Sequence, residues 1–379
     1  MTKRVFVLPI IALALVSCKT APKQRPTMER IVLSPDHRGF ILAQSHQPFH
    51  PWGFNYGNHG RLMEDFWDKD WNVLAADFRK MKSMGANVVR VHLQFGKFML
   101  GRNTPNYAAL HQYTRLLRLA EDTGIYLDVT GLASYRPSDV PTWYDNFDTR
   151  TRWEAQGNFW RAIARASASS PAIFCYDLMN EPFVPGSPRK LGDWRSGSLL
   201  GGYDFVQFIA LDPKKYSRDE VARAWIAFMH AAIRDHDTNT LVTVGMLPWS
   251  EQWHFLSGFD PHKCEDQLDF ISVHIYPDKK LPAEAMECAR EFAVGKPLVI
   301  EETFPLSCDS AQLEKFLYDS RDYATGWMGH YDGDSLAELD ALNRRHKLTI
   351  SQAIYRSWMQ LFLKLRPDFS LKSSSARAD

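Results

Sequence analysis

The sequence lacks the features that mark several common classes of protein. Its charges nearly cancel, with 45 Lys and Arg against 44 Asp and Glu, so it has no excess positive charge for binding nucleic acid. Beyond its N-terminal region it has no apolar run of about eighteen residues that would span a membrane. Its five cysteines form no CxxC or Cys/His spacing typical of a metal site, and no GxGxxG motif marks a dinucleotide-binding loop.

What the sequence does contain is a high proportion of apolar and aromatic residues. Of the 379 residues, 45% are hydrophobic and 13% are aromatic, and 12 are Trp. The apolar fraction excludes wholesale disorder, and the length allows one large domain or two ordinary ones. So many indole rings indicate either a large core or a surface that stacks on flat ligands.

The N-terminal residues are expected to be a targeting segment and a tether. The apolar run over residues 5–16 follows two basic residues and is too short to span a bilayer, which is typical of a secretory signal peptide. Residues 15–18, Leu-Val-Ser-Cys, resemble a bacterial lipobox, in which cleavage removes residues 1–17 and Cys18 is lipidated. We therefore expect residues 18–29 to be a tether and the protein to lie at a bacterial cell envelope, bound to the membrane by the lipid anchor only.

An envelope location permits disulfide bonds. Cys264 and Cys288 are a candidate pair, with two free thiols as the equal alternative. Cys175 lies in an apolar, strand-like run and is expected in the core.

Apolar, β-rich segments alternate with amphipathic helical patterns along residues 30–368. The expected strands are residues 51–56, 87–95, 124–131, 172–179, 241–246, 270–275, 297–300 and 323–328. The expected helices include residues 71–84, 107–122, 149–167, 350–363 and one that begins after a capping box at Ser217 and Glu220.

Eight such units predict an α/β fold, a (β/α)8 TIM barrel with long loops at the C-terminal face of the strands. Mostly continuous apolar strands fit a sheet that is buried on both faces. A doubly wound open sheet is the alternative, although its usual glycine-rich loop is absent. No break in composition marks a second domain, and residues 369–379 are expected to be a disordered tail.

Two long segments follow predicted strands without a clear element of their own, residues 182–217 and 330–347. Loops of this length in a compact domain are usually functional. Because they leave the C-terminal ends of the fourth and eighth strands, we expect them to wall off one end of the cleft. Such a cleft would favour short chains or exo-type action.

Polar residues collect where the predicted strands end, which is the place where barrel enzymes keep their active sites. Asn180 and Glu181 end the fourth strand, His274 and Tyr276 the sixth, and residues 301–302, both Glu, the seventh. Two opposed carboxylates suit the cleavage of a glycosidic bond, because one protonates the leaving oxygen and the other meets the oxocarbenium-like carbon. The alternative is that the glutamates form salt bridges at a barrel rim.

Residues 49–330 resemble the clan A glycoside hydrolases, and most of all glycoside hydrolase family 5, which includes cellulases and mannanases. The motif Asn180-Glu181-Pro182 and the strand over residues 296–302, KPLVIEE, carry the resemblance. It implies that Glu181 is the acid/base and Glu302 the nucleophile. Glu301, at a position that is often Gly in the family, is the alternative nucleophile.

The resemblance also implies supporting roles for other residues. Arg90 matches the Arg beneath the nucleophile, and His274 and Tyr276 match a pair on the sixth strand. Trp327 matches the platform on which the sugar stacks, and Asn180 would bind the sugar 2-OH. Three further residues at strand ends are candidates for sugar contacts, with plain packing as the alternative for the last two: Asn55, His92 and Trp249. Trp253 is a similar candidate.

Together these residues predict a retaining β-glycoside hydrolase that cleaves β-glucan-type or β-mannan-type substrates by double displacement. Its two carboxyl groups should lie about 5–5.5 Å apart. We expect a monomer that needs no metal or organic cofactor, acts on a β-linked carbohydrate and binds no nucleic acid. The alternatives are a glycosphingolipid-type glycanase and a lipid-anchored protein that binds glycan without cutting it.

Overall fold

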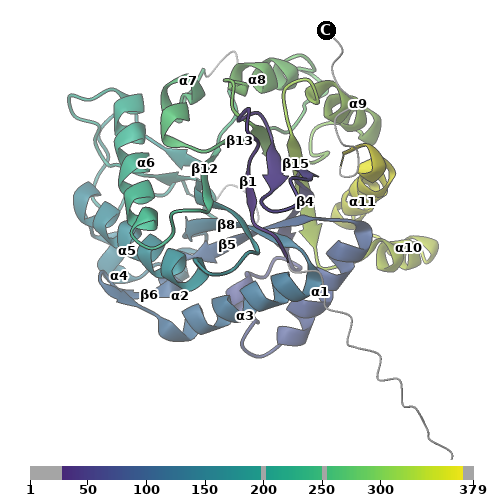
Figure 1. The fold of residues 1–379 in the computed structure, drawn as a ribbon, viewed down its shortest axis with the longest axis horizontal. Helices are drawn as coiled ribbons and strands as arrows, with labels where there is room; N and C mark the ends of the chain where they lie inside the picture. Colours follow the sequence, from purple (N-terminus) through teal and green to yellow (C-terminus); the bar gives the residue numbers. More distant parts are fainter. Residues whose placement is uncertain (1–27, 198–201, 250–253, 370–379) are drawn as a thin grey trace, which may run out of the picture.

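A closed barrel of eight parallel strands forms the centre of the molecule (Figure 1). The computed structural model describes residues 28–197, 202–249 and 254–369. The barrel confirms the predicted (β/α)8 fold, and pairing of the last strand with the first closes the ring. The strands are β4 (Trp52–Gly57), β5 (Val88–Gln94), β8 (Tyr126–Ala133), β9 (Ile173–Asn180), β12 (Leu241–Met246), β13 (Ile271–His274), β14 (Leu298–Glu302) and β15 (Gly326–Asp332).

Helices surround the barrel as an outer layer (Figure 1). Ser217 and Glu220 form the predicted capping box at the start of α6, and Gly85 ends α1 in the left-handed conformation that glycine adopts without strain. The longer helices are α1 (Trp71–Met84), α3 (Tyr107–Thr123), α5 (Thr149–Ser167), α6 (Arg218–Arg234), α8 (Glu284–Phe292), α9 (Ser310–Ser320), α10 (Leu336–Arg344) and α11 (Ile350–Phe369).

Short elements occupy the connections. The short helices are α2 (Phe95–Phe98), α4 (Thr142–Asp145), α7 (Pro261–Cys264), η1 (Met63–Asp65), η2 (Pro137–Asp139) and η3 (Glu265–Gln267). The short strands outside the barrel are β1 (Ile31–Leu33), β2 (Phe40–Leu42), β3 (Pro48–Phe49), β6 (Met99–Gly101), β7 (Thr104–Pro105), β10 (Pro182–Phe183) and β11 (Gln207–Phe208).

A small antiparallel sheet, β1–β2–β3, closes the end of the barrel where the strands begin. In Figure 1 its first strand crosses the middle of the ring. Phe40 meets Phe174 and Phe270 edge to face, at centroid distances of 5.1 and 5.2 Å. This sheet, which we call the barrel plug, leaves the opposite end of the barrel for a functional site.

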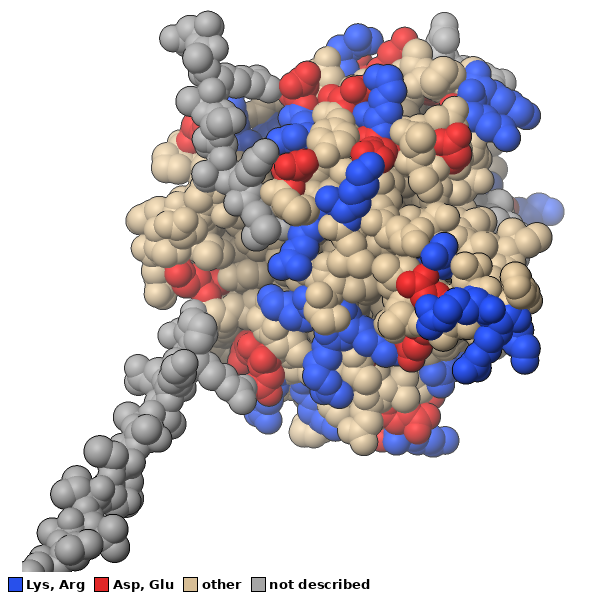
Figure 2. All heavy atoms as spheres, turned by 90° about the vertical axis from the view of Figure 1, so that its right-hand side faces the viewer, with Lys and Arg blue, Asp and Glu red and all other residues tan. Residues whose placement is uncertain are grey.

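Most of the buried Trp side chains belong to the hydrophobic core. Trp52, Trp160, Trp194, Trp225 and Trp358 rank among the largest fully buried side chains. The described cysteines, Cys264 and Cys288 included, are free thiols, so the alternative without a disulfide bond holds. Among helices in the described ranges, none has both the length and the apolar character needed to cross a membrane. Figure 2 shows basic and acidic side chains interspersed on the face formed by α9, α10 and α11, in keeping with the balanced composition.

Three expectations about segments need correction. Residues 330–347 are not a loop, because β15 continues to Asp332 and α10 follows at once. The segment 182–217 contains two short strands, β10 and β11, that pair in parallel. The tail does not begin at Phe369, which is buried at the end of α11; residues 370–379 lie outside the described ranges.

Candidate active site

Glu181 and Glu302 lie together at the open end of the barrel. Glu302 ends β14, and Glu181 follows β9 with a φ of 46°, a left-handed conformation that is rare for a residue with a side chain. The Glu181 N–H donates to the Gly245 carbonyl at 2.8 Å, which fixes this turn. One carboxylate oxygen of each glutamate and a ring nitrogen of His274 lie within 4.8 Å of one another.

Two donors hold Glu302 as a carboxylate. Arg90 Nη1 lies 2.5 Å from its Oε1, and the Tyr276 hydroxyl donates to its Oε2 at 2.5 Å. Burial raises the pKa of Glu302, but the positive charges of His274 and Arg90 outweigh it and lower the pKa well below its usual range. Glu302 is therefore ionised at neutral pH, as a nucleophile must be.

Glu301 also points into the barrel, but below the mouth. The pairing of β13 with β14 shifts register by one residue between Val273 and His274, and this irregularity lets two consecutive glutamates face inward. Glu301 is fully buried, and its Oε2 lies 3.5 Å from Arg90 and 3.4 Å from His274. Glu302 keeps 9% of its surface exposed, so it is the glutamate that a substrate can reach.

Two asparagines flank Arg90. Asn180 accepts from Arg90 Nη2 at 3.1 Å, and its Nδ2 donates to the Phe205 carbonyl at 3.2 Å. The expectation that Asn55 contacts sugar is wrong. Asn55 is buried, accepts from Arg90 and donates to the backbone carbonyls of Glu301 and Gly329, so it orients Arg90 instead.

The residues that form this site lie within a recognised family segment. Residues 44–316 match the family described as Cellulase (glycosyl hydrolase family 5). The chain belongs to this family. It is accordingly a glycoside hydrolase, and retention of configuration is characteristic of its clan.

Several solved structures share the fold at low sequence identity. An exo-β-1,4-mannosidase from Opitutaceae bacterium strain TAV5 is 16% identical, with a TM-score of 0.64 over 89% of this chain and 62% of that one. The chain thus spans less than two thirds of that protein's length. A β-1,4-mannanase from the sea hare Aplysia kurodai is 17% identical, with a TM-score of 0.60 over 91% of this chain and 100% of that one. No curated protein matches the sequence.

Trp327 does not form the sugar platform of this family 5 hydrolase. It is the second residue of β15, pairs with Trp52 at the beginning of β4, donates from Nε1 to Ser320 and packs edge to face on Phe369. It is therefore a buried residue far down the strand. The strand prediction over residues 323–328 ended too early, which placed Trp327 at the mouth.

The residue from β15 that reaches the active site is His330, which the sequence analysis missed. Its ring stacks on Tyr276 with an interplanar angle of 13°, and its Nε2 lies 2.8 Å from the Tyr276 hydroxyl. Burial lowers the pKa of His330, so the neutral ring donates to Tyr276, which in turn donates to Glu302. Little in the sequence signalled its role, because His330 lies two residues beyond the predicted end of the strand at residue 328.

Two other predicted sugar contacts of the hydrolase are half-buried side chains. His92 is half-buried on β5 and hydrogen-bonds through Nδ1 to the hydroxyl of Tyr135, another residue that sequence reasoning missed. Trp249 is half-buried after β12 and packs against the core and His254. Trp253 lies outside the described residues.

A loop after β9 crosses part of the barrel mouth of the hydrolase. The N–H of Asp204 donates to the Tyr135 carbonyl at 2.7 Å, which ties the loop to the segment after β8. The Tyr203 hydroxyl donates to the carbonyl of Gly60, which follows β4. We call residues 202–208 the crossing segment. It comes after β9 in the chain and contacts a residue after β4, so it passes over the ends of β5 and β8.

Two groups of possible metal ligands lie inside the barrel. They are Glu181 with His274 and Glu302, and Asp128 with Asp177 and Glu301. Arg90 forms an ion pair with a member of each group, at 2.5 Å to Glu302 and 2.7 Å to Asp177. Its guanidinium already contacts carboxylate oxygens of both groups and offsets part of their negative charge, so these groups fit a hydrogen-bonded network better than a metal centre.

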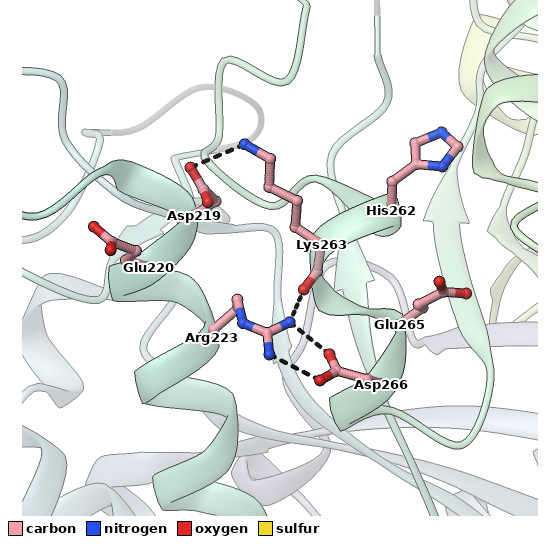
Figure 3. Close-up of a pocket in the computed structure, with 7 residues that line it drawn as sticks. All are labelled: Asp219, Glu220, Arg223, His262, Lys263, Glu265 and Asp266. Carbon is pink, nitrogen blue, oxygen red and sulfur yellow. Dashed lines mark hydrogen bonds and ion pairs between the residues drawn. The ribbon is translucent and has the colours of Figure 1, made fainter.

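A charged surface hollow between α6 and the segment from α7 to η3 is separate from the active site (Figure 3). Lys263 pairs with Asp219 at 3.3 Å, and Arg223 forms a bidentate pair with Asp266. Because these charges pair with one another, we interpret the hollow as the contact between α6 and the segment from α7 to η3 rather than as a binding site. It shares no lining residue with the site around Glu181 and Glu302.

Proposed function

We propose that the protein is an exo-acting, retaining β-mannosidase that removes single sugars from short β-1,4-linked chains. The observation that carries the glycosidase mechanism is the close approach of Glu181 to Glu302, with Arg90 and Tyr276 donating to Glu302. A carboxylate oxygen from each glutamate within 4.8 Å fits the spacing of about 5–5.5 Å used for retention.

In the first step, Glu302 attacks the anomeric carbon while Glu181 gives its proton to the leaving oxygen. The bond between that carbon and the leaving oxygen breaks, and a covalent glycosyl-enzyme forms on Glu302. Asn180 would exchange its contact with the Phe205 carbonyl for one with the sugar 2-OH, which strengthens in the transition state.

In the second step, water attacks the anomeric carbon from the face that the leaving group has vacated. Glu181, now a carboxylate, takes a proton from this water, and the bond to Glu302 breaks. Two inversions at one carbon give net retention. Tyr276 then returns its hydrogen bond to the released carboxylate, supported by His330.

Two observations support exo action on mannosides. The crossing segment bars extension of a glycan over the β4, β5 and β8 sector of the mouth, since Tyr203 contacts Gly60 across it. The solved structures with this fold include an exo-β-1,4-mannosidase and a β-1,4-mannanase, so a β-mannoside is the substrate to test first.

We also propose that the mature protein is anchored to a bacterial envelope membrane through Cys18. The support is the lipobox-like sequence at residues 15–18, which lies outside the described residues. Labelling with a radioactive fatty acid should mark the wild-type protein and not C18A, and label on C18A would contradict the proposal.

The function is tested with dinitrophenyl and methylumbelliferyl β-mannosides, matching β-glucosides and β-1,4-mannan. Wild type should release single mannose units with the β anomer formed first, as followed by NMR. E302Q should lose turnover of every substrate by about 10³-fold or more. E181Q should fail mainly on the poorer leaving group, because dinitrophenolate needs no proton.

E291Q changes a partly exposed Glu on α8; it is the matched control and should behave like wild type. An α anomer as first product would contradict retention. Faster hydrolysis of long mannan than of short oligosaccharides would contradict exo action. Faster hydrolysis of the β-glucosides than of the matching β-mannosides would contradict the proposal that a β-mannoside is the substrate.

A further inference from the structure

Behind the catalytic glutamates lies a row of fully buried polar side chains: Asp128, Glu301 and His274. His274 Nδ1 lies 2.9 Å from Glu181 Oε1, and His274 Nε2 lies 3.4 Å from Glu301 Oε2. Both ring nitrogens thus face carboxylate oxygens. Glu181 can carry its acid proton on Oε2 and still accept from Nδ1–H through Oε1. Both ring nitrogens then face acceptor oxygens, which favours a doubly protonated ring.

Asp128 lies at the other end of the row. One oxygen each of Asp128, Asp177 and Glu301 lie within 4.8 Å of one another, and all three side chains are fully buried. As carboxylates, both oxygens of Asp128 and Oε1 of Glu301 would have no N–H or O–H donor among the described residues, and only the weakly donating thiol of Cys175 faces Asp128. A hydrogen on Asp128 removes one charge from this crowded interior and gives Glu301 a donor.

We propose that Glu301 is a positioning residue that holds His274 as an imidazolium with its Nδ1–H fixed on Glu181. In this arrangement Asp128 is a neutral carboxylic acid that donates to Glu301 from the opposite side. We call Asp128, Glu301 and His274 the buried relay.

The surrounding charges agree with this arrangement. Burial lowers the pKa of His274, but the charge of Glu302 and the hydrogen bonds to Glu181 and Glu301 raise it to about 10. Burial and the charge of Glu301 raise the pKa of Asp128 well above its usual range. The other ionisable groups that face the relay are Arg90 and His92 on β5, Cys175 and Asp177 on β9, Tyr276 after β13 and His330 on β15.

The neighbouring strand is shaped to admit the relay. A Cβ atom on Gly245 of β12 would lie 2.8 Å from Arg90 Nη2, 2.9 Å from Glu301 Oε2 and 3.0 Å from His274 Nε2. A side chain at this position would therefore displace the contact between Glu301 and His274. The absence of a side chain at Gly245 keeps that contact possible.

The relay has a consequence for the reaction, and this step rests on the proposed role of Glu181 as the acid/base. When Glu181 gives up its proton, the imidazolium stabilises the carboxylate that remains. The charge on His274 persists in the second step, when Glu302 is esterified. Weakening the relay should therefore impair substrates whose leaving group needs a proton and spare those whose leaving group does not.

The protonation of His274 is measured directly by ¹⁵N NMR of the imidazole rings in the whole protein, with the signal assigned by its loss in H274Q. In wild type both ring nitrogens should keep their hydrogens at pH 8. In E301Q the pH at which one ring hydrogen is lost should lie about 1–3 units below that of wild type, because the facing charge is removed. The matched control E291Q removes a carboxylate from the exposed His262 and should leave His274 unchanged.

Kinetics provide the second readout. In E301Q, kcat/KM for a methylumbelliferyl glycoside should fall about 10-fold, because a charge-assisted hydrogen bond is roughly twice as strong as a neutral one. For the dinitrophenyl glycoside the change should stay below about 2-fold. An equal loss on both substrates would indicate a merely structural role and overturn the proposal.

A wild-type His274 with one ring hydrogen at pH 7 would also overturn the proposal, whether or not E301Q folds. D128N should keep His274 doubly protonated, because its amide also donates to Glu301; loss of that state would contradict a neutral Asp128. Failure of the glycosidase proposal is seen separately, as turnover that survives in E302Q.

Discussion

At the residue scale, the nucleophile depends on donors from three different strands. Arg90 comes from β5, Tyr276 follows β13 and His330 lies on β15, and together they hold Glu302 through direct contacts or through Tyr276. None of these contacts is local in sequence, so only the closed barrel assembles them.

Y276F removes the hydroxyl that donates to Glu302. A hydrogen bond to a charged group contributes about 1.5–3 kcal/mol, so kcat on an aryl β-mannoside should fall about 10- to 100-fold. Because Glu302 loses a donor to its ionised form, the acid limb of the pH–rate profile should also move to higher pH. The measurement is kcat against pH, and an unchanged acid limb would show that Tyr276 does not stabilise the carboxylate.

The sequence predicted the site residues whose role follows from their place at the end of a strand. It did not predict residues whose role depends on contacts below the mouth of the barrel. Glu181, Glu302, Arg90, His274 and Tyr276 were all expected at the site and all meet there. In the sequence Asp128 is only one residue of an apolar strand, because the residues next to it in the chain do not indicate that a carboxylate from β14 lies beside it. Its role depends on the register shift beside Glu301, which no local pattern reveals.

At the element scale, strand boundaries decided which predictions held. The helix over residues 71–84 and the strand over residues 241–246 have the predicted bounds, since Gly85 and the surrounding polar residues mark their ends. The last barrel strand lies three to four residues later than expected. Its polar end, which includes His330 and Asp332, resembles a loop in composition, and this misplaced Trp327.

The crossing segment supports a prediction about chain length. Y203F removes the hydrogen bond to the Gly60 carbonyl, which should loosen this wall of the cleft. A neutral hydrogen bond contributes about 0.5–1.5 kcal/mol, so the rate on long mannan relative to an aryl β-mannoside should rise about 2- to 10-fold. Y216F, at an exposed Tyr later in the same connection, is the control, and an unchanged ratio in Y203F would contradict the wall.

The barrel plug should stabilise the fold without taking part in the reaction. F40A removes a buried ring that packs on Phe174 and Phe270, and a change of this kind typically costs about 3–5 kcal/mol. Urea unfolding should show this loss, while kcat of the folded protein stays unchanged. Y107A, at a residue that is 76% exposed, should stay within about 0.5 kcal/mol of wild type; a fall of kcat in F40A would contradict a purely structural plug.

At the scale of the whole molecule, one buried carboxyl group makes stability depend on pH. Burial raises the pKa of Glu64 to about 7, although one of its oxygens accepts from the Gln94 N–H at 2.8 Å. The folded protein therefore binds more protons than the unfolded chain between pH 4.5 and 7 at this group. Its contribution to stability falls as the pH rises through that window.

E64Q lacks this titration, so its free energy of unfolding relative to wild type should be more favourable at pH 8 than at pH 5. Urea unfolding at both pH values measures the change. E154Q, at a partly exposed residue of α5, is the control for the loss of one negative charge. An equal difference between E64Q and wild type at both pH values would contradict the linkage.

The barrel plug also determines how an anchored enzyme would be oriented. Tyr126, at the beginning of its strand, donates to the Glu29 carbonyl, so the chain enters the described structure at the end of the barrel opposite Glu181 and Glu302. From a lipidated Cys18, the ten residues to Met28 reach at most about 35 Å. The enzyme would then stand close to the bilayer with its cleft turned outward, where it meets diffusing oligosaccharides rather than the headgroups beneath it.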